Sequence, residues 1–386
     1  MTAMVYDLRR LEESRDLVHR AVEALAQGKI LVVPTETVYG LVASGLHAET
    51  IERLAALKTQ APKYPNALAF GVKSADDALD YCPDFSPLAR RLARRCWPGP
   101  LTIVTPALHR DSVVQRLPKS VRNLTMQPGT IALRAPAHEF TMQVFRLNAG
   151  PVILTTVSED GQTHATTVDE IPPSIRAAVD VIFDAGPCRF SQPSTIVRID
   201  GNRWTVLRPG VMDSNTIKRM SQVTIMLVCT GNTCRSPMAA GILKTRLAQR
   251  LGLTVESLAA QGVHVVSAGV AAMSGAPASP QAVQVGAQMG FDLSEHGSQP
   301  VSDRLVQDAD LILTMTDGHR QAIISRWPQA ASRTFLVARN QNDVSDPIGL
   351  PVEYYARCAE QINQALDWWL EHHPALQISD ADQGHE

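Results

Sequence analysis

The chain has 386 residues and a formal net charge of −2; 45% of its residues are hydrophobic and 19% are charged. This length exceeds what one ordinary domain packs around a single core, so we expect two domains in a globular protein. The composition argues against a secretory signal, a membrane-spanning segment or a strongly basic nucleic-acid-binding surface. Six scattered cysteines favour a reducing, cytoplasmic setting.

The first half contains short apolar segments that end in turn-forming or cationic residues. Leu31–Gly40 indicates a buried strand that runs into a glycine turn, and Trp97–Thr102 a rigid turn before a strand at Leu101–Thr105. Ile131–Arg134 is typical of a strand that ends in a cation. Three similar segments follow, at Asp184–Pro187, Pro193–Val197 and Leu207–Gly210. The pattern predicts an α/β domain with a mixed sheet.

Three cationic residues of this half are candidates for binding an anion. Lys58, Arg134 and Arg208 could face an anionic ligand near Ser194 and Thr195. The residues alone leave two interpretations open, a nucleotide site or cations scattered over the surface.

A polar stretch separates the two halves. Residues 211–222 show no apolar periodicity, and a new buried strand begins at Thr224. We therefore place a linker at 214–222, between a first domain at 1–213 and a second at 223–377. A short acidic tail follows at 378–386.

The second half alternates apolar runs typical of strands with helical patterns. The expected strands are Ile225–Val228, Val263–Ser267, Leu311–Met315 and Thr334–Val337, and the expected helices are Met238–Leu251, Pro280–Met289, Gly318–Ser325 and Val352–His372. This alternation predicts a flavodoxin-like or Rossmann-like parallel sheet with helices on both faces. Such sheets bind ligands at the carboxyl ends of their strands, and Cys229 directly follows the first strand.

The segment Cys229-Thr-Gly-Asn-Thr-Cys-Arg-Ser-Pro237 lies between that strand and a helix. A loop that leads into a helix N-terminus turns backbone N–H groups inward and forms an anion cradle, which also favours the thiolate form of Cys229. Arg235 adds a planar fork of donors that matches phosphate oxygens. The loop residues expected to contact or shape the bound group are Thr230, Gly231, Asn232, Thr233 and Ser236.

These residues predict a phosphatase that works through a covalent intermediate. The thiolate of Cys229 attacks phosphorus and forms a phosphocysteine, while Arg235 holds the phosphoryl group. A general acid must protonate the leaving group and later activate water. Asp346 is the candidate and Asp343 the alternative, and their spacing does not separate them.

Residues 224 to about 375 resemble the low-molecular-weight protein tyrosine phosphatases. The resemblance rests on the Cys-x5-Arg-Ser-Pro loop, on Ser267-Ala-Gly269, on Ala309–Met315 and on the pair Asp346-Pro347. It implies a phosphorylated protein as substrate, with Cys229 as nucleophile, Arg235 as phosphate ligand and Asp346 as general acid. It also implies that the phosphatase needs no metal ion or organic cofactor.

Two positions of the loop refine this expectation. At the position of Thr233, tyrosine-specific members usually have a bulky aliphatic residue, whereas the protein-arginine-phosphatase branch has threonine. We therefore favour phosphoarginine over phosphotyrosine as the substrate. Cys234 has two interpretations. It is either a small buried residue or, as the resemblance implies, the partner of Cys229 in a reversible protective disulfide.

The first half resembles the YrdC-like threonylcarbamoyl-AMP synthases. The resemblance implies that ATP, with Mg²⁺, reacts with threonine and bicarbonate, in support of tRNA modification, and it suggests binding of tRNA or double-stranded RNA. The implied threonine-site residues are Thr35, Arg134 and Ser194. The implied ATP-site residues are Lys58, Asn66, Thr130, Thr156, Ser158 and Arg208.

Several positions depart from that family's pattern. Gln60 stands where the family has a phosphate-binding arginine, Gly71 where it has histidine, and Ser158 where it has asparagine. His164 and Arg198 replace a serine and an aspartate. Two hypotheses therefore remain for the first half, an active synthase or a degenerate module that binds nucleotide or RNA without catalysis.

Overall fold

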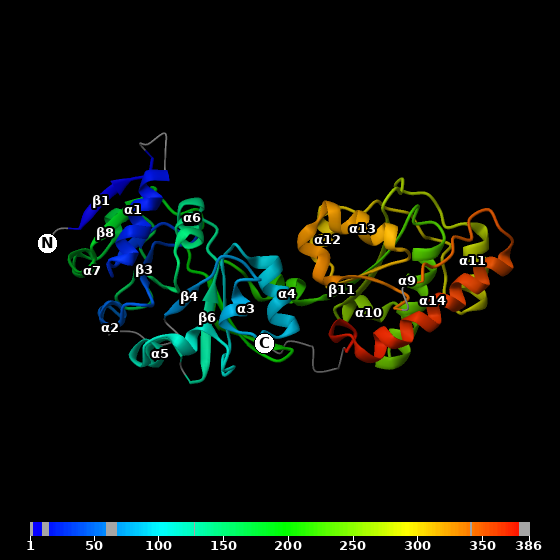
Figure 1. The fold of residues 1–386 in the computed structure, drawn as a ribbon, viewed down its shortest axis with the longest axis horizontal. Coiled ribbons are helices and arrows are strands. Elements are labelled where there is room, and N and C mark those ends of the chain that lie inside the picture. The colour runs from blue at the N-terminus through cyan, green and yellow to red at the C-terminus, as the bar shows by residue number, and fades with distance from the viewer. Residues whose placement is uncertain (1–2, 10–14, 59–67, 127, 340–341, 378–386) are drawn as a thin grey trace. The chain divides into compact units, whose positions relative to one another are not determined.

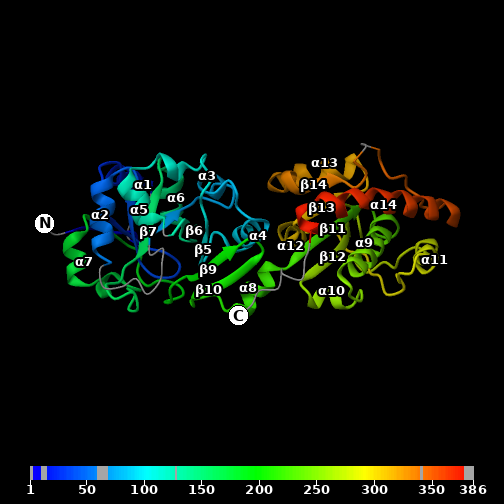
Figure 2. The same ribbon diagram turned by 90° about the horizontal axis from the view of Figure 1, so that it is seen from below.

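The structure is a computed structural model, and it describes residues 3–9, 15–58, 68–126, 128–339 and 342–377. The chain forms two compact units, with the boundary between Met220 and Ser221. Each unit contains its own sheet and its own hydrophobic core (Figures 1 and 2). None of the helices in the described ranges is both long and apolar enough to span a membrane.

The first unit is built on a mixed sheet of ten strands in the order β1-β8-β2-β3-β7-β4-β6-β5-β9-β10. Parallel pairs such as β4 with β6 and antiparallel pairs such as β5 with β6 both occur. This confirms the expected mixed α/β architecture. The strands are β1 Met4–Asp7, β2 Leu31–Val33, β3 Gly40–Ser44, β4 Ala69–Gly71, β5 Leu101–Pro106, β6 Thr130–Arg134, β7 Val152–Thr156, β8 Val181–Asp184, β9 Thr195–Asp200 and β10 Arg203–Arg208.

Helices cover both faces of this sheet. The α-helices are α1 Arg15–Ala26, α2 Ala48–Ala56, α3 Ala78–Tyr81, α4 Pro87–Cys96, α5 Lys119–Thr125, α6 Glu139–Leu147, α7 Pro173–Ala178 and α8 Ser214–Ser221, with 3₁₀ helices η1 Val113–Arg116 and η2 Val168–Glu170. Alternate residues of a strand face opposite sides of a sheet. Accordingly, Leu31 and Val33 pack with α1 and α6, whereas Val32 packs in the larger core with α2 and α4.

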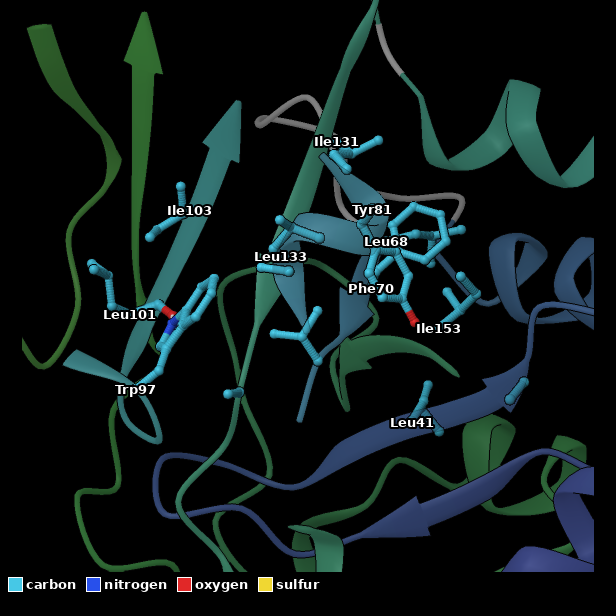
Figure 3. Close-up of a cluster of buried hydrophobic side chains, with 14 of the residues drawn as sticks. Leu41, Leu68, Phe70, Tyr81, Trp97, Leu101, Ile103, Ile131, Leu133 and Ile153 are labelled. Carbon is cyan, nitrogen blue, oxygen red and sulfur yellow. The ribbon is translucent and has the colours of Figure 1, made fainter. Parts of the chain in front are cut away.

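The larger core is dense in branched and aromatic side chains. Phe70 of β4, Ile103 of β5 and Leu133 of β6 are fully buried and lie within one cluster with Tyr81 and Trp97 (Figure 3). Several strands of this unit end in a polar or charged residue, among them β6 at Arg134, β7 at Thr156 and β10 at Arg208, so polar side chains border the apolar core.

The second unit is a four-stranded sheet in the order β12-β11-β13-β14, and all of its pairs are parallel. The strands are β11 Val223–Cys229, β12 Val263–Gly269, β13 Leu311–Thr314 and β14 Thr334–Leu336. The strands β11 and β12 contain their expected segments, and β13 and β14 each end one residue before theirs. The parallel sheet of the flavodoxin-like prediction is therefore confirmed, and its central strand β11 ends at Cys229.

Two helical layers sandwich this sheet. The α-helices are α9 Arg235–Leu251, α10 Ser257–Ala260, α11 Pro280–Gln288, α12 Asp303–Asp308, α13 Asp317–Arg326 and α14 Val352–His372, with 3₁₀ helices η3 Pro328–Arg333 and η4 Pro374–Leu376. Ile225 and Leu227 share a core with α9 and α14, while Met226 and Val228 share the opposite core with α12 and α13. A strand buried on both faces needs this continuous apolar run.

Two local differences from the sequence expectations have physical causes. The residues expected to link the domains form helix α8, because Ile217 is fully buried in the core of the first unit and anchors the polar helix. Gly40 lies at the first residue of β3 rather than in a turn. A Cβ on Gly40 would lie 2.8 Å from Leu154 of the neighbouring strand β7, so close strand packing accounts for this glycine.

Candidate functional site

The catalytic loop of the second unit runs from the last residue of β11 to the first residue of α9. Cys229 ends the strand, and Arg235 begins the helix. The Cys229 side chain is buried in the loop, where its sulfur lies 3.0 Å from Ser236 Oγ and accepts the backbone N–H of Asn232 at 3.2 Å. The Asn232 N–H and the helix N-terminus are the groups here that suit negative charge on the sulfur.

Asn232 fixes the shape of the loop from its centre. It is fully buried and adopts a left-handed backbone conformation, with φ of 56°. Its side-chain amide donates to Ser236 Oγ and Ser267 Oγ at 2.9 Å each, and its side-chain oxygen accepts the backbone N–H of Gln299 at 2.9 Å. Its carbonyl oxygen is 2.7 Å from His296 Nε2. The loop is therefore held in place by bonds to two other segments.

Gly269 makes room for the loop on the neighbouring strand β12. It lies directly opposite Cys229 in the sheet register. A Cβ at this position would lie 2.4 Å from the carbonyl oxygen of Thr230 and 3.0 Å from the backbone nitrogen of Asn232. The glycine of the Ser267-Ala-Gly269 segment is thus a steric requirement for the loop's path.

Arg235 and Asp346 meet beside the loop. The Arg235 guanidinium contacts the Asp346 carboxylate, donates to the carbonyl oxygen of Val344 at 3.2 Å, and donates to Thr230 Oγ1 at 3.3 Å. The Arg235 side chain is 5% exposed and that of Asp346 is 40% exposed, so the carboxylate reaches solvent. The Asp343 carboxylate instead accepts the backbone N–H of Asp317 at 2.8 Å and caps α13. The geometry favours Asp346 as the general acid.

Thr233 and Cys234 are the last two loop residues before α9. Thr233 is half-buried, and its hydroxyl lies 3.6 Å from the sulfur of Cys234. Both Cys229 and Cys234 are free thiols. The sulfur of Cys234 is 3.4 Å from Ser279 Oγ and 3.6 Å from the hydroxyl of Tyr355, so polar groups from α14 and from the N-cap of α11 surround it.

A cavity of about 280 Å³ in the first unit is lined by all three cationic residues identified as candidates in that half. Of the residues expected to bind ligand, Lys58, Arg134, Thr156, Ser194 and Arg208 line it. Lys58 follows α2, Arg134 ends β6, Thr156 ends β7, Ser194 precedes β9 and Arg208 ends β10. The topology therefore assembles one cationic cavity from segments far apart in the sequence.

Lys58 and Arg208 are held in this cavity by oxygen atoms. The Lys58 ammonium contacts the carbonyl oxygen of Thr156, and it donates to the Ser158 carbonyl at 3.1 Å. Arg208 donates to the Ser194 carbonyl at 2.8 Å, and Ser194 Oγ lies 2.9 Å from Thr102 Oγ1. Burial, with the charge of Arg208 as a second cause, lowers the pKa of Lys58 to about 8.

Arg134 extends from this cavity toward the segment after β2. It donates to Glu36 Oε1 at 2.9 Å and to Thr37 Oγ1 at 2.6 Å. Thr37 Oγ1 lies 2.9 Å from Thr35 Oγ1, which donates to the carbonyl of Val38 at 2.6 Å. Thr35 itself lines a separate hollow of about 420 Å³ with Glu36 and Pro98. Arg134 and Thr35 are thus connected through Thr37 rather than by a shared cavity.

Other expected residues of the first unit lie at the edge of the cavity or away from it. The hydroxyl of Ser158 accepts the backbone N–H of Gly161 at 2.9 Å, and it lies 3.2 Å from the carboxylate of Asp160. Thr130 begins β6, is buried and pairs with Pro106, outside the cavity lining. Asn66 lies outside the described residues, as does Gln60.

Comparison with known proteins assigns each unit to a family. A family model described as low molecular weight phosphotyrosine protein phosphatase matches residues 224–378. A model of the Sua5, YciO and YrdC proteins, described as telomere recombination, matches residues 23–210. The chain belongs to both families, one in each half.

The individual relatives each match only part of the chain. “Probable low molecular weight protein-tyrosine-phosphatase EpsP” of Ralstonia nicotianae is 39% identical over 148 residues, which are 38% of this chain and 93% of the relative. The protein-arginine-phosphatase of Geobacillus stearothermophilus is 36% identical over 147 residues, which are 37% of this chain and 90% of the relative. Threonylcarbamoyl-AMP synthase of Pyrococcus abyssi is 28% identical over 245 residues, which are 63% of this chain and 68% of the relative. Both resemblances seen in the sequence are therefore confirmed.

Two departures from the YrdC-like pattern have a structural counterpart. A Cβ on Gly71 would lie 2.3 Å from the ring of Phe145, so the phenyl ring fills the space that a histidine side chain would need. His164 lines the cavity, and burial, followed by the charges of Arg208 and Lys58, lowers its pKa to about 4. At neutral pH it adds a polar ring but no charge.

Three residues near the two sites escaped the sequence prediction. His319 of α13 contacts Thr230 in the catalytic loop, and Thr102 contacts Ser194 in the cationic cavity. Asp160 lines the same cavity and accepts the backbone N–H groups of Gln162 and Thr163. The folding of the chain brings each of these residues to its site, and no local sequence motif marks any of them.

Proposed function

We propose that the second unit hydrolyses phosphorylated protein side chains through a phosphocysteine on Cys229. The observation that carries this is the buried sulfur at the end of β11, bonded by the Asn232 N–H and lying beside Ser236 Oγ, with Arg235 at its side. Membership in the low molecular weight phosphatase family supports it. The Asn232 N–H and the following helix N-terminus are placed to stabilise a sulfur anion, which is the nucleophile in covalent catalysis by cysteine.

Each step has a group in place. The sulfur of Cys229 forms a bond to phosphorus while the bond from phosphorus to the leaving nitrogen or oxygen breaks. The carboxyl proton of Asp346 goes to that leaving atom. In the second step the Asp346 carboxylate takes a proton from water, the water oxygen bonds to phosphorus, the S–P bond breaks and orthophosphate leaves. Arg235 compensates the phosphoryl charge throughout.

We propose phosphoarginine rather than phosphotyrosine as the preferred substrate. The small hydroxyl side chain of Thr233 supports this, because it leaves space beside the loop and offers a hydrogen-bond partner to a guanidinium. The named relatives include both a tyrosine phosphatase and an arginine phosphatase. The test is hydrolysis of phosphoarginine and phosphotyrosine peptides side by side, with Cys229→Ser as the blank.

A matched variant makes this test specific. Thr233→Ile restores an aliphatic side chain at the same position, so we expect it to lower kcat/KM for phosphoarginine and to leave the phosphotyrosine value similar or higher. A wild-type preference for phosphotyrosine would keep the nucleophile and refute the assigned substrate.

For the first unit we propose threonylcarbamoyl-AMP synthesis from ATP, threonine and bicarbonate in the cytoplasm. The observation that carries it is the cavity in which Lys58, Arg134 and Arg208 converge with Ser194. ATP would enter as its Mg²⁺ complex, so that the metal belongs to the substrate. Lys58 and Arg208 bind phosphate oxygens, while Arg134 binds the threonine carboxylate, because cations with several N–H donors suit such anions.

Pyrophosphate release tests the proposal. Full-length protein carrying Cys229→Ser, which silences the second unit, is given ATP, threonine and bicarbonate. We expect pyrophosphate that depends on all three. ATP binding without pyrophosphate would instead support a binding module. Binding of tRNA, with double-stranded RNA for comparison, is a separate measurement that tests the proposed RNA partner.

A further inference from the structure

A buried histidine outside the catalytic loop contacts one of the loop's hydroxyl groups. His319 lies in the first turns of α13 and is 6% exposed. Its Nε2 atom is 2.9 Å from Thr230 Oγ1, and its Nδ1 atom is 2.9 Å from Thr316 Oγ1. Both ring nitrogens are therefore engaged, and rotating the ring would break both bonds.

The imidazole of His319 is neutral at physiological pH. Burial, followed by the positive charge of Arg235, lowers its pKa to about 4, although Asp346 and Asp343 act in the opposite direction. A neutral imidazole has one N–H donor and one acceptor nitrogen. Thr316 Oγ1 already accepts the backbone N–H of His319 at 3.3 Å, and its own proton can go to Nδ1.

The hydroxyl of Thr230 lies between His319 and the phosphate-binding arginine. It accepts a hydrogen bond from Arg235 at 3.3 Å, and its side chain is on the exposed part of the loop. A phosphoryl group bound to Arg235 presents only acceptor oxygens. If such a group lies within reach of the Thr230 hydroxyl, the O–H is the donor in that contact. Its two lone pairs are then free for Arg235 and for an N–H of His319.

We propose that His319 is a positioning residue, which holds the Thr230 hydroxyl through Nε2–H so that this hydroxyl donates to the phosphoryl group. The inference rests on the proposed phosphatase function and adds a residue to its substrate-binding machinery. The Thr316 hydroxyl, donating to Nδ1, selects the required tautomer. The hydrogen bonds that connect Thr316, His319 and Thr230 thus orient the hydroxyl proton of Thr230 in the catalytic loop.

The test uses full-length protein and inorganic phosphate as the probe, measured by calorimetry. His319→Leu removes the N–H, His319→Gln keeps a side-chain N–H donor, and Thr230→Val removes the hydroxyl. A double variant combines His319→Leu with Thr230→Val. The control is Ile323→Ala, which truncates a fully buried side chain on the same helix without touching the loop.

We expect His319→Leu and Thr230→Val each to weaken phosphate binding by roughly tenfold, the usual size of a hydrogen bond to a charged group. The double variant should be no weaker than either single one, and His319→Gln should recover most of the affinity. Ile323→Ala should lower the melting temperature and leave phosphate affinity unchanged. Additive losses in the double variant, or an equal loss in Ile323→Ala, would overturn the proposal.

The phosphate measurement separates this inference from the proposed function. If wild-type protein binds phosphate but hydrolyses neither peptide substrate, the phosphatase proposal fails, and the dissociation constants still decide the role of His319. If wild-type protein hydrolyses substrate and His319→Leu binds phosphate normally, only the positioning role is refuted. If wild-type protein binds no phosphate, both the phosphatase proposal and the positioning role of His319 are refuted.

Discussion

The guanidinium of Arg235 contacts the carboxylate of Asp346, although 111 positions separate them in the sequence. We expect a phosphoryl group bound at Arg235 to compete with Asp346 for this guanidinium, so that substrate binding would free the carboxyl group next to the leaving atom. The proposed mechanism therefore requires two arrangements of this residue pair, one before and one after substrate binds.

The first prediction concerns the leaving group. With Asp346→Ala we expect kcat for phenyl phosphate, which has a poor leaving group, to fall by about a hundredfold. The loss for p-nitrophenyl phosphate should be much smaller, because that leaving group departs without a proton. Steady-state kinetics on both substrates measure the difference. Asp343→Ala is the matched control, and the same dependence there would transfer the acid role to Asp343.

The second prediction tests the steric role of Gly269. Gly269→Ala places a Cβ 2.4 Å from the Thr230 carbonyl oxygen and should displace the loop. We expect weaker phosphate binding and a free energy of unfolding lower by about 1–3 kcal/mol, the usual cost of overpacking. Gly297→Ala is the control, because its nearest neighbour would be 3.8 Å away. Normal phosphate affinity in Gly269→Ala would contradict the account.

The third prediction follows from the lowered pKa of Lys58. Since that pKa is about 8, the side chain is mainly a cation at pH 7 and mainly a neutral amine at pH 9. We expect ATP affinity to fall as the pH rises across this range, with a midpoint at or above 8 because a bound phosphate raises the pKa. Calorimetry on the Cys229→Ser protein measures it.

Two lysine variants control this measurement. Lys58→Gln should bind ATP weakly and lose the pH dependence, whereas Lys119→Gln, at an exposed position in α5, should behave as the parent does. A pH profile that survives in Lys58→Gln would assign it to another group.

The fourth prediction concerns the contact between Gly71 and Phe145. Gly71→Ala should lower the free energy of unfolding by about 1–3 kcal/mol, since the new Cβ would lie 2.3 Å from the Phe145 ring. Phe145→Leu makes room, so the double variant should be more stable than the sum of the two single losses predicts. Chemical denaturation of all three proteins gives the coupling. Simple additivity would show that the ring is not the obstacle.

The catalytic loop was predictable because its parts are consecutive in the sequence. The apolar run before Cys229, the glycine and asparagine within the loop, and the proline after Arg235 together specify strand, turn and helix. The alternating pattern of the second half likewise gave each strand of the parallel sheet. The proposal of Asp346 over Asp343 as general acid rests on the fold, since both belong to one short segment, and Asp346 contacts Arg235 whereas Asp343 accepts the backbone N–H of Asp317.

Other features depend on contacts that no local pattern records. His319 lies 89 positions from Thr230, and its sequence neighbourhood resembles any helix start. The helix at 214–221 depends on one buried residue, Ile217, within a polar segment. In the first unit, the packing of Phe145 against Gly71 joins two residues whose proximity follows from the order of the strands and helices rather than from spacing.

The nucleophile ends a strand that is buried along its whole length and paired on both sides. Regions open locally when few buried contacts hold them, whereas a central strand opens only with its whole unit. We therefore expect the catalytic loop to lose its shape only when this unit unfolds. On heating, hydrolysis should persist until this unit unfolds and vanish in the same cooperative transition, so thermal inactivation reports the stability of the sheet itself.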